Sequence, residues 1–480
     1  MYDVILIGAG PANIFLAYKL LTNKPGLRVL MIEKGNSIEN RRCPQRDDNS
    51  MKCVGCNVCS ITSGFSGAGA FSDGKLTLAS SITGGCLDEL LGEEKMRELI
   101  QEADSIYLSF GADKNLKGID KECISRIRKK AIQANMKLVE SPIRHLGTDG
   151  AFSIYEKMQA VLKDMGVEMH FNETVESIKT HTGEDGNESV CAVITQKSGK
   201  LNKYDSGIIV AGTGREGSSW FKDICDTLGV KTQPGTVDMG VRVECRNEVM
   251  EELNNSMYES KLIYHSRTYA DRVRTFCQNP GGEVALENYN LPDGSRIRTV
   301  NGHAYKDAAM KTDNTNFALL VSKNFTEPFR EPLEYGAAYA KIANMLAGGT
   351  VLVQSYGDIK RGRRSTPERI LQGNAIPTLK DAVPGDLMSC IPARIMSDII
   401  EMIEAMDNIA PGIANDETLL YGIEVKFYSN KVIIDMDGQT SLKGLYAVGD
   451  SSSWTRGLSF ASAMGLHVGN AISKKFDTTS

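Results

Sequence analysis

Apolar and polar positions follow the periods of a strand, a helix and a second strand over the first 33 residues. Residues 2–7 form an apolar run, a glycine-containing turn follows, and apolar positions that include Ile14, Ala17 and Leu20 then recur at helical spacing. A second apolar run ends at Glu33. This order predicts a βαβ unit at the start of the chain.

The pattern changes several times beyond this unit. Residues 43–78 show no clear period and are rich first in cysteine and then in glycine, whereas residues 87–135 carry charged, helical patterns. A helix with one apolar face is expected at 151–165, followed by a strand and a small β-meander. The run at 207–214 is apolar up to its glycines, which is typical of a parallel strand covered on both faces.

The second half of the chain returns to the first pattern only near its end. Residues 221–417 carry scattered turn signals and isolated helices, one of them expected at 393–408, before an apolar strand at 444–450 and a helix from about Leu458. The fold class expected is therefore α/β, with a Rossmann-like domain that carries a β-meander and an inserted α+β substrate domain. The predicted boundaries are 1–220 and 418–480 for the nucleotide-binding domain and 221–417 for the substrate domain.

Composition narrows the class of protein. A chain of 480 residues is too long for one compact core, which predicts more than one domain. Its 41% of hydrophobic residues is enough for each domain to form a core of its own. The net charge of −5 lacks the basic surplus of a nucleic-acid binder. Because the first strand starts directly after Met1 and no apolar run approaches the roughly 20 residues that cross a bilayer, we expect a cytoplasmic protein without a leader or a membrane span.

The turn after the first strand has the spacing of a dinucleotide-binding fingerprint. Gly8 makes the turn, and Gly10 lets the backbone approach a pyrophosphate at the helix N-terminus. Glu33 ends the second strand, where a carboxylate accepts hydrogen bonds from the adenosine ribose. Asn13 replaces the usual Gly or Ala, so we expect the helix to lie slightly further from the strand. The residues predicted to contact a dinucleotide here are Gly8, Gly10, Pro11, Ala12, Asn13, Glu33 and Lys34.

The segment GLYAVGD at 444–450 and the small-residue helix after it resemble the closing motif of two-dinucleotide-binding-domain flavoproteins, which have the FAD fold of glutathione reductase. The resemblance implies that Asp450 accepts a ribityl hydroxyl of FAD. It also implies that the following helix points its N-terminus at the flavin, where negative charge accumulates on reduction. The implied contacts are Gly449, Asp450, Gly457, Leu458 and Ala461.

A third segment resembles another FAD motif of the same proteins. It consists of Ala211, Gly212, Thr213 and Gly214, after an apolar strand. With the next residues it also spells GxGxxG, so a second dinucleotide site for NAD(P) is the alternative. We favour FAD, because a β-meander precedes the motif and no helix and strand ending in an acid follow it. Val175, in the strand before the meander, is predicted to make a backbone contact with adenine.

Several segments together resemble a bacterial family of largely uncharacterised FAD-dependent dehydrogenases over nearly the whole chain. They are residues 63–76, 237–244, 277–283, 301–304, 316–320 and 419–429. The resemblance implies the fold and non-covalent FAD, but no particular substrate. In related flavoproteins the glycine-rich segment after the second strand runs along the flavin, which makes Gly67, Ala68, Gly69 and Lys75 candidates here. A glycine loop without a cofactor contact is the alternative.

A flavin dehydrogenase needs an acid or base, and often a group that holds an anion. The candidates for proton transfer are Lys75, Glu283 and His303, which we predict to converge on the flavin from two domains. Arg242 is a candidate for holding an anion, and the basic run 360–364 could hold an acidic substrate or form a solvated loop. Each of these residues also fits a structural role.

Eleven cysteines in a chain expected in the cytoplasm indicate thiols or metal ligands rather than disulfides. Four of them cluster, namely Cys43, Cys53, Cys56 and Cys59. The CxxCxxC run with a remote Cys-Pro resembles ferredoxin ligation with the remote ligand first, and predicts a [4Fe–4S] cluster. Structural zinc and reduced thiols that form a reversible disulfide are the alternatives.

The predicted function is that of a FAD-dependent oxidoreductase that moves a hydride or an electron pair to or from a small organic substrate. Electrons could be relayed through the iron–sulfur cluster on the four cysteines, with NAD(P)H or a ferredoxin-like carrier as the electron partner. No nucleic acid or membrane partner is expected. The alternatives are a tRNA-modifying flavoprotein and a non-catalytic sensor in which flavin and thiols report redox state.

Overall fold

The computed structural model describes residues 1–44, 56–71, 74–79, 86–184, 186–257, 259–291, 295–304, 308–326, 328–329, 331–426 and 430–477. The chain forms two compact units. Unit 1 comprises Met1–Asn115, Ile143–Gly235 and Tyr428–Ser480, and unit 2 comprises Leu116–Pro142 and Thr236–Phe427.

A parallel five-stranded sheet is the centre of unit 1, in the order β23-β11-β1-β2-β7. Its strands are β1 Val4–Ile7, β2 Val29–Glu33, β7 Glu168–Phe171, β11 Ile209–Ala211 and β23 Leu445–Ala447. Four of the five are buried at every position, as apolar strands covered on both faces must be. The predicted βαβ unit and the predicted parallel strands are confirmed.

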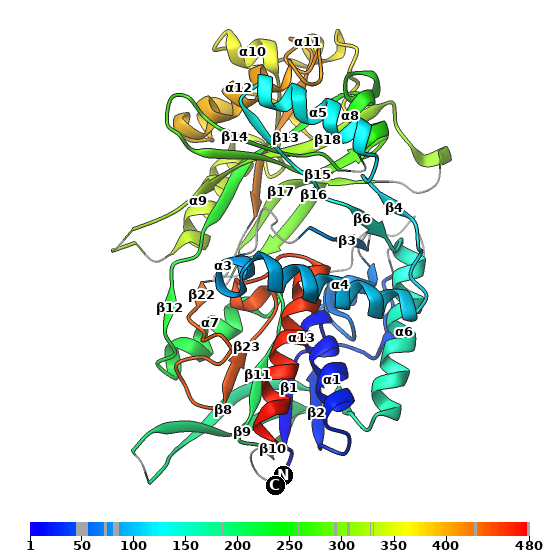
Figure 1. Ribbon diagram of the computed structural model, residues 1–480. Coiled ribbons are helices and arrows are strands. Elements are labelled where there is room, and N and C mark those ends of the chain that lie inside the picture. The colour runs from blue at the N-terminus through cyan, green and yellow to red at the C-terminus, as the bar shows by residue number, and fades with distance from the viewer. Residues whose placement is uncertain are drawn as a thin grey trace. The chain divides into compact units, whose positions relative to one another are not determined.

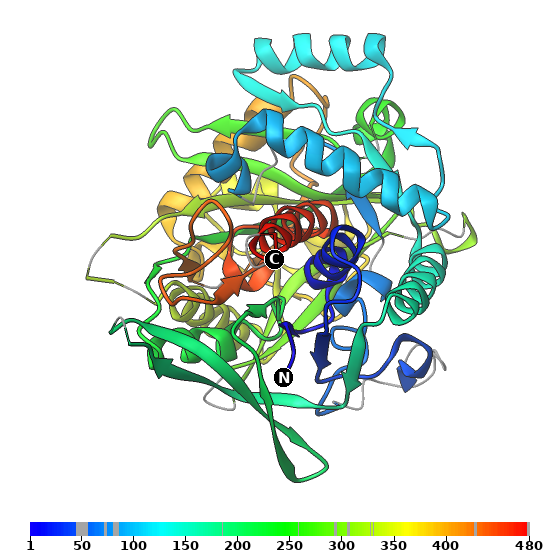
Figure 2. The same ribbon diagram turned by 60° about the horizontal axis from the view of Figure 1, so that its bottom comes forward.

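Helices α1 and α13 pack side by side on this unit (Figures 1 and 2). The contact is backbone to backbone, because a Cβ atom on Gly465 would lie 2.1 Å from the carbonyl oxygen of Ala12. The helices of unit 1 are α1 Pro11–Asn23, α3 Leu87–Leu91, α4 Glu93–Ser109, α6 Thr148–Asp164, α7 Ser218–Thr227 and α13 Leu458–Lys475. Three short 3₁₀ helices join them, η1 Ile38–Asn40, η2 Gly67–Phe71 and η6 Asp450–Ser452.

The predicted β-meander of unit 1 is also present. It is an antiparallel sheet of β8 Thr174–Thr182, β9 Glu188–Lys197 and β10 Lys200–Asp205. Two small strand pairs complete the unit, β3 Lys75–Thr77 with β6 Ile143–His145, and β12 Thr232–Gln233 with β22 Lys431–Val432.

Unit 2 is built on a mixed eight-stranded sheet in the order β20-β19-β21-β13-β18-β15-β14-β5. The strands are β5 Met136–Val139, β13 Val237–Arg246, β14 Lys261–His265, β15 Arg272–Pro280, β18 Asn314–Lys323, β19 Leu352–Ser355, β20 Val383–Pro384 and β21 Leu419–Lys426. A hairpin of β16 Glu283–Asn290 and β17 Arg296–His303 accompanies it. The fold class predicted from the sequence, a Rossmann-like α/β domain with an inserted α+β domain, is confirmed.

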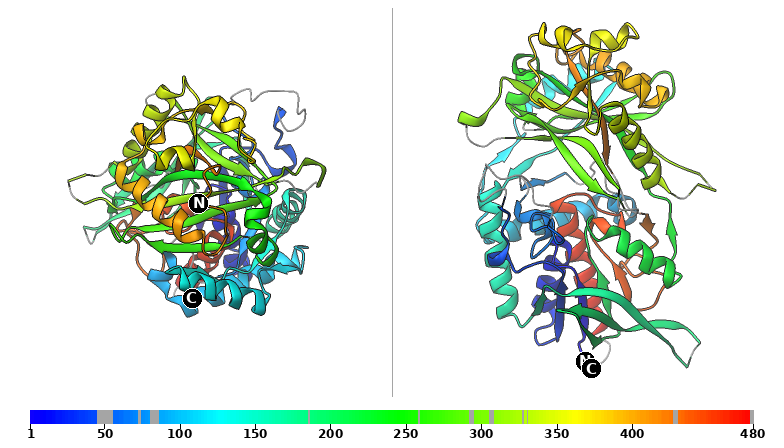
Figure 3. Two further views of the ribbon diagram at one scale, coloured as in Figure 1. Left: turned by 90° about the horizontal axis from the view of Figure 1, so that it is seen from above. Right: turned by 180° about the vertical axis from the view of Figure 1, so that it is seen from behind.

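Helix α12 lies across the green strands of this sheet (Figure 3) and contacts β13, β15 and β18. The helices of unit 2 are α5 Lys121–Gln133, α8 Glu251–Ser256, α9 Pro332–Leu346, α10 Tyr356–Lys360, α11 Pro367–Leu371 and α12 Ala393–Met406. The short elements β4 Leu116–Lys117, η3 Asn247–Met250, η4 Ala308–Met310 and η5 Leu387–Ser389 connect them.

The central strand of unit 2 buries both of its faces. Val237, Met239, Val241 and Val243 of β13 belong to the hydrophobic core, whereas the alternate positions include the buried Asp238, Arg242 and Glu244. Side chains alternate between the two faces of a strand, so one face of the sheet is apolar and the other is charged. The sequence pattern did not predict this sheet.

The unit boundaries differ from the predicted domain boundaries at 220 and 417. Residues 116–142 join unit 2, because β5 pairs with β14 and α5 packs on β5. No helix in the described part of the chain is both long and apolar enough to cross a membrane.

Candidate functional site

The turn between β1 and α1 requires glycine at its first position. Gly8 has φ +92°, and a Cβ atom there would lie 2.6 Å from the carbonyl oxygen of Gly212. Gly10 is the N-cap of α1, no side chain caps this end, and Pro11 follows at the first helical position. The first N–H groups of the helix thus point out of its end, where they can meet an anion.

Asn13 takes up the space that a neighbouring glycine leaves. Its side chain is fully buried, and Nδ2 donates to the carbonyl oxygens of Ile7 at 2.9 Å and Gly8 at 2.8 Å. A Cβ atom on Gly212 would lie 2.7 Å from Asn13 Nδ2. The larger residue in α1 is therefore accommodated by a glycine after β11, and its amide ties α1 to the end of β1.

The Glu33 carboxylate binds backbone on three sides. It accepts N–H donors from Ala9, Gly35 and Gly64, each at 2.9 Å, and the residue is only 7% exposed. A carboxylate offers about four acceptor positions, so about one remains for a ribose hydroxyl. Glu33 therefore also joins the turn after β1 to the glycine-rich segment that begins near Gly64. Lys34 pairs with Glu216 at 3.3 Å.

The glycine-rich segment that contains Gly67 and Gly69 lies against the N-termini of α1 and α13. A Cβ atom on Gly67 would lie 3.7 Å from the Cα of Gly10, and one on Gly69 would lie 3.1 Å from a methyl carbon of Leu458, at the start of α13. Ala68, between these two glycines, is exposed. Lys75 begins β3 and is half-buried.

The C-terminal motif brings Asp450 to the carboxyl end of β23. A Cβ atom on Gly449 would lie 3.2 Å from Ala12 Cβ, so this turn meets the start of α1. The Asp450 carboxylate accepts from the Thr455 hydroxyl at 2.9 Å and pairs with Arg215 at 3.3 Å. Gly457 is the N-cap of α13, whose first turn has neither a side-chain cap nor an acidic residue.

The third motif belongs to the same sheet as the first. Strand β11, which carries Ala211, lies between β1 and β23, and the Gly212 N–H donates to the Ile7 carbonyl oxygen at 2.9 Å. Helix α7 follows, but the next strand, β12, pairs with β22 outside this sheet. This arrangement favours one dinucleotide site over two. Thr213 donates from its hydroxyl to the Gly217 carbonyl oxygen, and Val175 is buried in β8.

Two of the three predicted catalytic residues are neighbours in unit 2. Glu283 and His303 are directly opposite each other in the β16–β17 hairpin. His303 is exposed and Glu283 is partly buried, so both can be reached by a solute. Lys75 belongs to unit 1, and its convergence with this pair stays a prediction.

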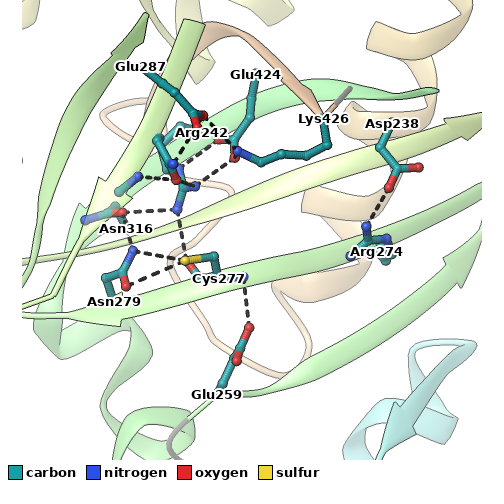
Figure 4. A network of polar contacts seen from close by, with 12 residues as sticks. Asp238, Arg242, Glu259, Arg274, Cys277, Asn279, Glu287, Asn316, Glu424 and Lys426 are labelled. Carbon is teal, nitrogen blue, oxygen red and sulfur yellow. Dashed lines mark hydrogen bonds and ion pairs between the residues drawn. The ribbon is translucent and has the colours of Figure 1, made fainter. Parts of the chain in front are cut away.

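Arg242 is the centre of a buried network of polar contacts (Figure 4). It makes two hydrogen bonds of 2.8 Å to Glu424, and the others reach the Cys277 carbonyl oxygen, Asn316 and Asn301 at 2.9, 3.3 and 3.2 Å. A guanidinium has five N–H donors, and all five are used. Arg242 therefore holds protein groups rather than the anion predicted for it.

Lys426 continues the network on the same face of the sheet. Its ammonium lies 3.2 Å from Glu424 and 3.4 Å from Glu287. Burial alone would lower the pKa of Lys426, but these two carboxylates outweigh it and raise the pKa. Two cations and two carboxylates thus balance, which is how buried charge is tolerated. The basic run is also paired, since Arg361 binds Asp416 at 2.6 Å.

Glu244 is a further buried charged residue of this sheet, and the sequence did not single it out. This buried carboxylate accepts from Asn314 Nδ2 at 3.1 Å and from the hydroxyls of Thr378 and Tyr421, and burial raises its pKa. The period-two spacing of Asp238, Arg242 and Glu244 within an otherwise apolar run was the available signal.

Residues 236–427, nearly the whole of unit 2, match the family model described as FAD-dependent protein, C-terminal domain-like. Unit 2 therefore resembles the C-terminal domain of this FAD-dependent protein family. Residues 3–54 match the model of the lycopene cyclase protein family. The first match agrees with the resemblance to FAD-dependent proteins found in the sequence.

A curated relative and several solved structures are similar to this chain. An uncharacterized protein of Clostridium beijerinckii (strain ATCC 51743 / NCIMB 8052) is 25% identical over 98% of this chain and 81% of its own length. A quinol-fumarate reductase is 12% identical, with a TM-score of 0.45 over 100% of this chain and 72% of that one. A geranylgeranyl bacteriochlorophyll reductase-like protein of Thermoplasma acidophilum is 12% identical, with a TM-score of 0.40 over 99% and 79%.

The residues of unit 1 fit the FAD that the family implies. Gly10, Gly67 and Gly449 bring three backbone segments without side chains to the N-terminus of α1. Such a backbone-lined cradle next to the first N–H groups of a helix suits a pyrophosphate. No acidic side chain stands in the first turn of α1 or of α13 to repel it. The N-termini of α1 and α13, together with Asp450, would hold this cofactor.

Three of the four cysteines predicted to bind a metal lie among the described residues. Cys43 and Cys59 are partly buried, Cys56 is exposed, and all three are free thiols, while Cys53 lies outside the described residues. Within the described ranges no three His, Cys, Asp or Glu side chains lie together as metal ligands would.

Proposed function

We propose that this FAD-dependent protein is an oxidoreductase that binds FAD without a covalent link in unit 1 and moves a hydride or an electron pair to or from a small organic molecule. The observation that carries the proposal is the backbone-lined end of α1, where Gly8, Gly10, Gly67 and Gly449 meet. A side chain at Gly8 or Gly449 would press on Gly212 or Ala12 and so displace the backbone that lines this end of α1. FAD, when bound, accepts or donates the electron pair.

The chain's own residues would hold and orient this cofactor. The N-terminus of α1 binds the pyrophosphate, and the remaining acceptor position of Glu33 takes a ribose hydroxyl. Thr455 and Arg215 hold the Asp450 carboxylate from two sides, which orients it toward a ribityl hydroxyl. The uncapped N-terminus of α13 stabilises negative charge beside it.

Glu283 and His303 are our candidates for holding and moving a proton at the substrate. They face each other across the hairpin, which allows one residue to orient the other. The hairpin is anchored to a buried network in which the cations Arg242 and Lys426 balance the carboxylates Glu424 and Glu287. Asn301 of β17 makes the connection, because it hydrogen-bonds to both Arg242 and Glu287. NAD(P)H or a ferredoxin-like carrier is the proposed electron partner.

Purified protein is expected to carry one FAD per chain that heat or acid releases intact. Glu33→Ala and Asp450→Ala should each lower the FAD content and raise its dissociation constant at least tenfold, since each removes a charge-assisted hydrogen bond of about 1.5–3 kcal/mol. Asp437→Asn, an exposed acid of the same unit, is the control. Cofactor release is followed by absorbance and mass spectrometry. Protein that is colourless and filled with NAD would falsify the proposal.

An anaerobic flavin-reduction screen separates the oxidoreductase from its alternatives. Reduction by NADH, NADPH or reduced ferredoxin, followed by reoxidation with one member of a metabolite panel, supports an enzyme. A flavin that is reduced by dithiols but never reoxidised by a metabolite indicates a redox sensor. Transfer of a methyl group or other substituent to tRNA would indicate a modifying flavoprotein.

We further propose that Cys43, Cys53, Cys56 and Cys59 bind one metal centre, a [4Fe–4S] cluster in preference to zinc. The support is the CxxCxxC spacing and the tight turn after Cys59, whose carbonyl oxygen accepts from the N–H groups of Thr62 and Ser63 at 3.1 and 2.9 Å. Anaerobic purification should give about four iron and four sulfide per chain. Less than about half an equivalent of any metal, with all four thiols freely alkylated, would contradict both metal centres.

A further inference from the structure

Arg41 is almost completely buried against residues 60–66 of unit 1, with 3% of its surface exposed. Its Nε and Nη2 donate to the Ser60 carbonyl oxygen at 2.9 and 2.7 Å, and Nη2 also donates to that of Ile61 at 3.0 Å. Nη1 donates to the Phe65 carbonyl oxygen at 2.6 Å and to the Ser66 hydroxyl at 3.1 Å. All five N–H donors are thus used on one short segment, residues 60–66.

This segment has a backbone that needs outside support. Gly64, Ser66 and Gly67 have φ values of +112°, +74° and +55°. The left-handed conformation of a non-glycine residue costs about 1–3 kcal/mol, and it persists where the surroundings fix it. Ser66 is fully buried, and its N–H donates to the Ala9 carbonyl oxygen at 2.7 Å. The strained residue is therefore the one that contacts the dinucleotide turn.

Glu33 holds the same segment from the opposite side. Its Oε1 accepts the N–H of Gly64, and its Oε2 accepts the N–H of Ala9, both at 2.9 Å. The packing at Gly64 is equally close on the other side, because a Cβ atom there would lie 2.8 Å from Arg41 Cδ. Gly64 is thus enclosed between a buried carboxylate and a buried guanidinium. Ala9 thus donates its N–H to Glu33 and accepts the N–H of Ser66 on its carbonyl oxygen.

The guanidinium stays charged in this position, because an arginine side chain is not deprotonated in proteins. The charge strengthens its hydrogen bonds to carbonyl oxygens, which a neutral group could not match. The face of the guanidinium also packs over the ring of Phe71, with 4.5 Å between its central carbon and the ring centroid.

We propose that Arg41, together with Glu33, positions the glycine segment 60–69 against the dinucleotide turn, so that the cofactor meets a preformed surface. Arg41 is a positioning residue, because all its donors bind protein. Preforming a binding surface raises affinity by reducing the ordering that binding must impose. The inference rests on the proposed function, since it takes FAD as the molecule bound at this surface.

The test compares Arg41→Lys with Arg42→Lys. Lysine keeps the charge but has three donors on one nitrogen, and cannot reach the four acceptors that Arg41 joins. Arg42 is the exposed neighbour and serves as the matched control. In Arg41→Lys the amides of Gly64, Ser66 and Gly67 are expected to exchange hydrogen at least tenfold faster, and FAD is expected to dissociate at least tenfold faster. The amides of β1 should exchange at the wild-type rate.

A second variant distinguishes two roles of Glu33: holding residues 60–69 together with Arg41, which we call the clamp, and contacting the ribose directly. Glu33→Gln keeps an acceptor oxygen for the ribose, but its NH₂ group would face an N–H donor of Ala9 or Gly64. We expect faster exchange at Ser66 in this variant as well. Hydrogen exchange is measured on protein freed of cofactor, so it tests the clamp even if the wild-type chain does not bind FAD.

Three results would overturn the proposal. The first is Arg41→Lys protein with exchange and FAD dissociation within twofold of wild type. The second is equal acceleration over the whole of unit 1, including β1, because that would be a general loss of stability. The third is faster exchange at 64–67 without faster FAD dissociation, because the segment would then be held for a purpose other than the cofactor.

Discussion

Arg242→Ala is expected to lower the free energy of unfolding by about 3–5 kcal/mol, which is the loss typical when one partner of a buried ion pair is removed. The substitution leaves Glu424 fully buried without its two hydrogen bonds of 2.8 Å. It also leaves Asn301, Asn316 and the Cys277 carbonyl oxygen without their shared donor. Urea-induced unfolding measures the difference.

Arg246→Ala is the matched control for this prediction. Arg246 is on the same strand, but its side chain is 32% exposed and pairs with Glu248 and Asp313 at the surface. Exposed pairs contribute about 0–1 kcal/mol, so this variant should be nearly neutral. Equal effects of the two variants would show that burial of the Arg242 network does not matter.

A double variant tests whether charge balance is the cause. Arg242→Met combined with Glu424→Gln leaves Lys426 paired with Glu287, so one cation and one carboxylate remain. The double variant should then recover more than half of the stability that Arg242→Met alone loses. A double variant as unstable as Arg242→Met would indicate lost packing instead.

The βαβ unit could be predicted because its signal is local. The glycines, the helical period and Glu33 all lie within the first 33 residues, and each has a fixed place in a strand, a turn or a helix. Strands β11 and β23 are covered on both faces and therefore appear as plain apolar runs. The packing of Asn13 could not be predicted from this unit alone. The space for its side chain is left by Gly212, which is remote in sequence.

The sheet of unit 2 could not be predicted in the same way. A strand that buries charge on one face, as β13 does at Asp238, Arg242 and Glu244, has the alternation of a half-exposed strand. What compensates those charges comes from other strands, such as Glu424 of β21. The clamp of Arg41 is a similar case, since its acceptors are backbone oxygens that no side-chain pattern reveals.

The contact between α1 and α13 gives the last prediction. Gly465→Ala would place a Cβ atom 2.1 Å from the Ala12 carbonyl oxygen and 3.0 Å from the Leu16 nitrogen. Both neighbours are backbone atoms of a helix and cannot move aside singly, so the two helices must separate. Overpacking of this kind costs about 1–3 kcal/mol or more, and we expect the upper end. FAD should also dissociate faster, because the N-termini of both helices belong to the proposed cofactor surface.

Gly150→Ala is the matched control, and its expected effect has the opposite sign. Gly150 lies in α6 of the same unit, with nothing within 4 Å of its Cβ position. Alanine there should raise stability by about 0.4–1 kcal/mol, because it restricts the unfolded chain without a clash. Thermal unfolding and FAD dissociation are measured for both variants. A Gly465→Ala protein as stable as Gly150→Ala would mean that α1 and α13 do not approach as closely as the backbone contact requires.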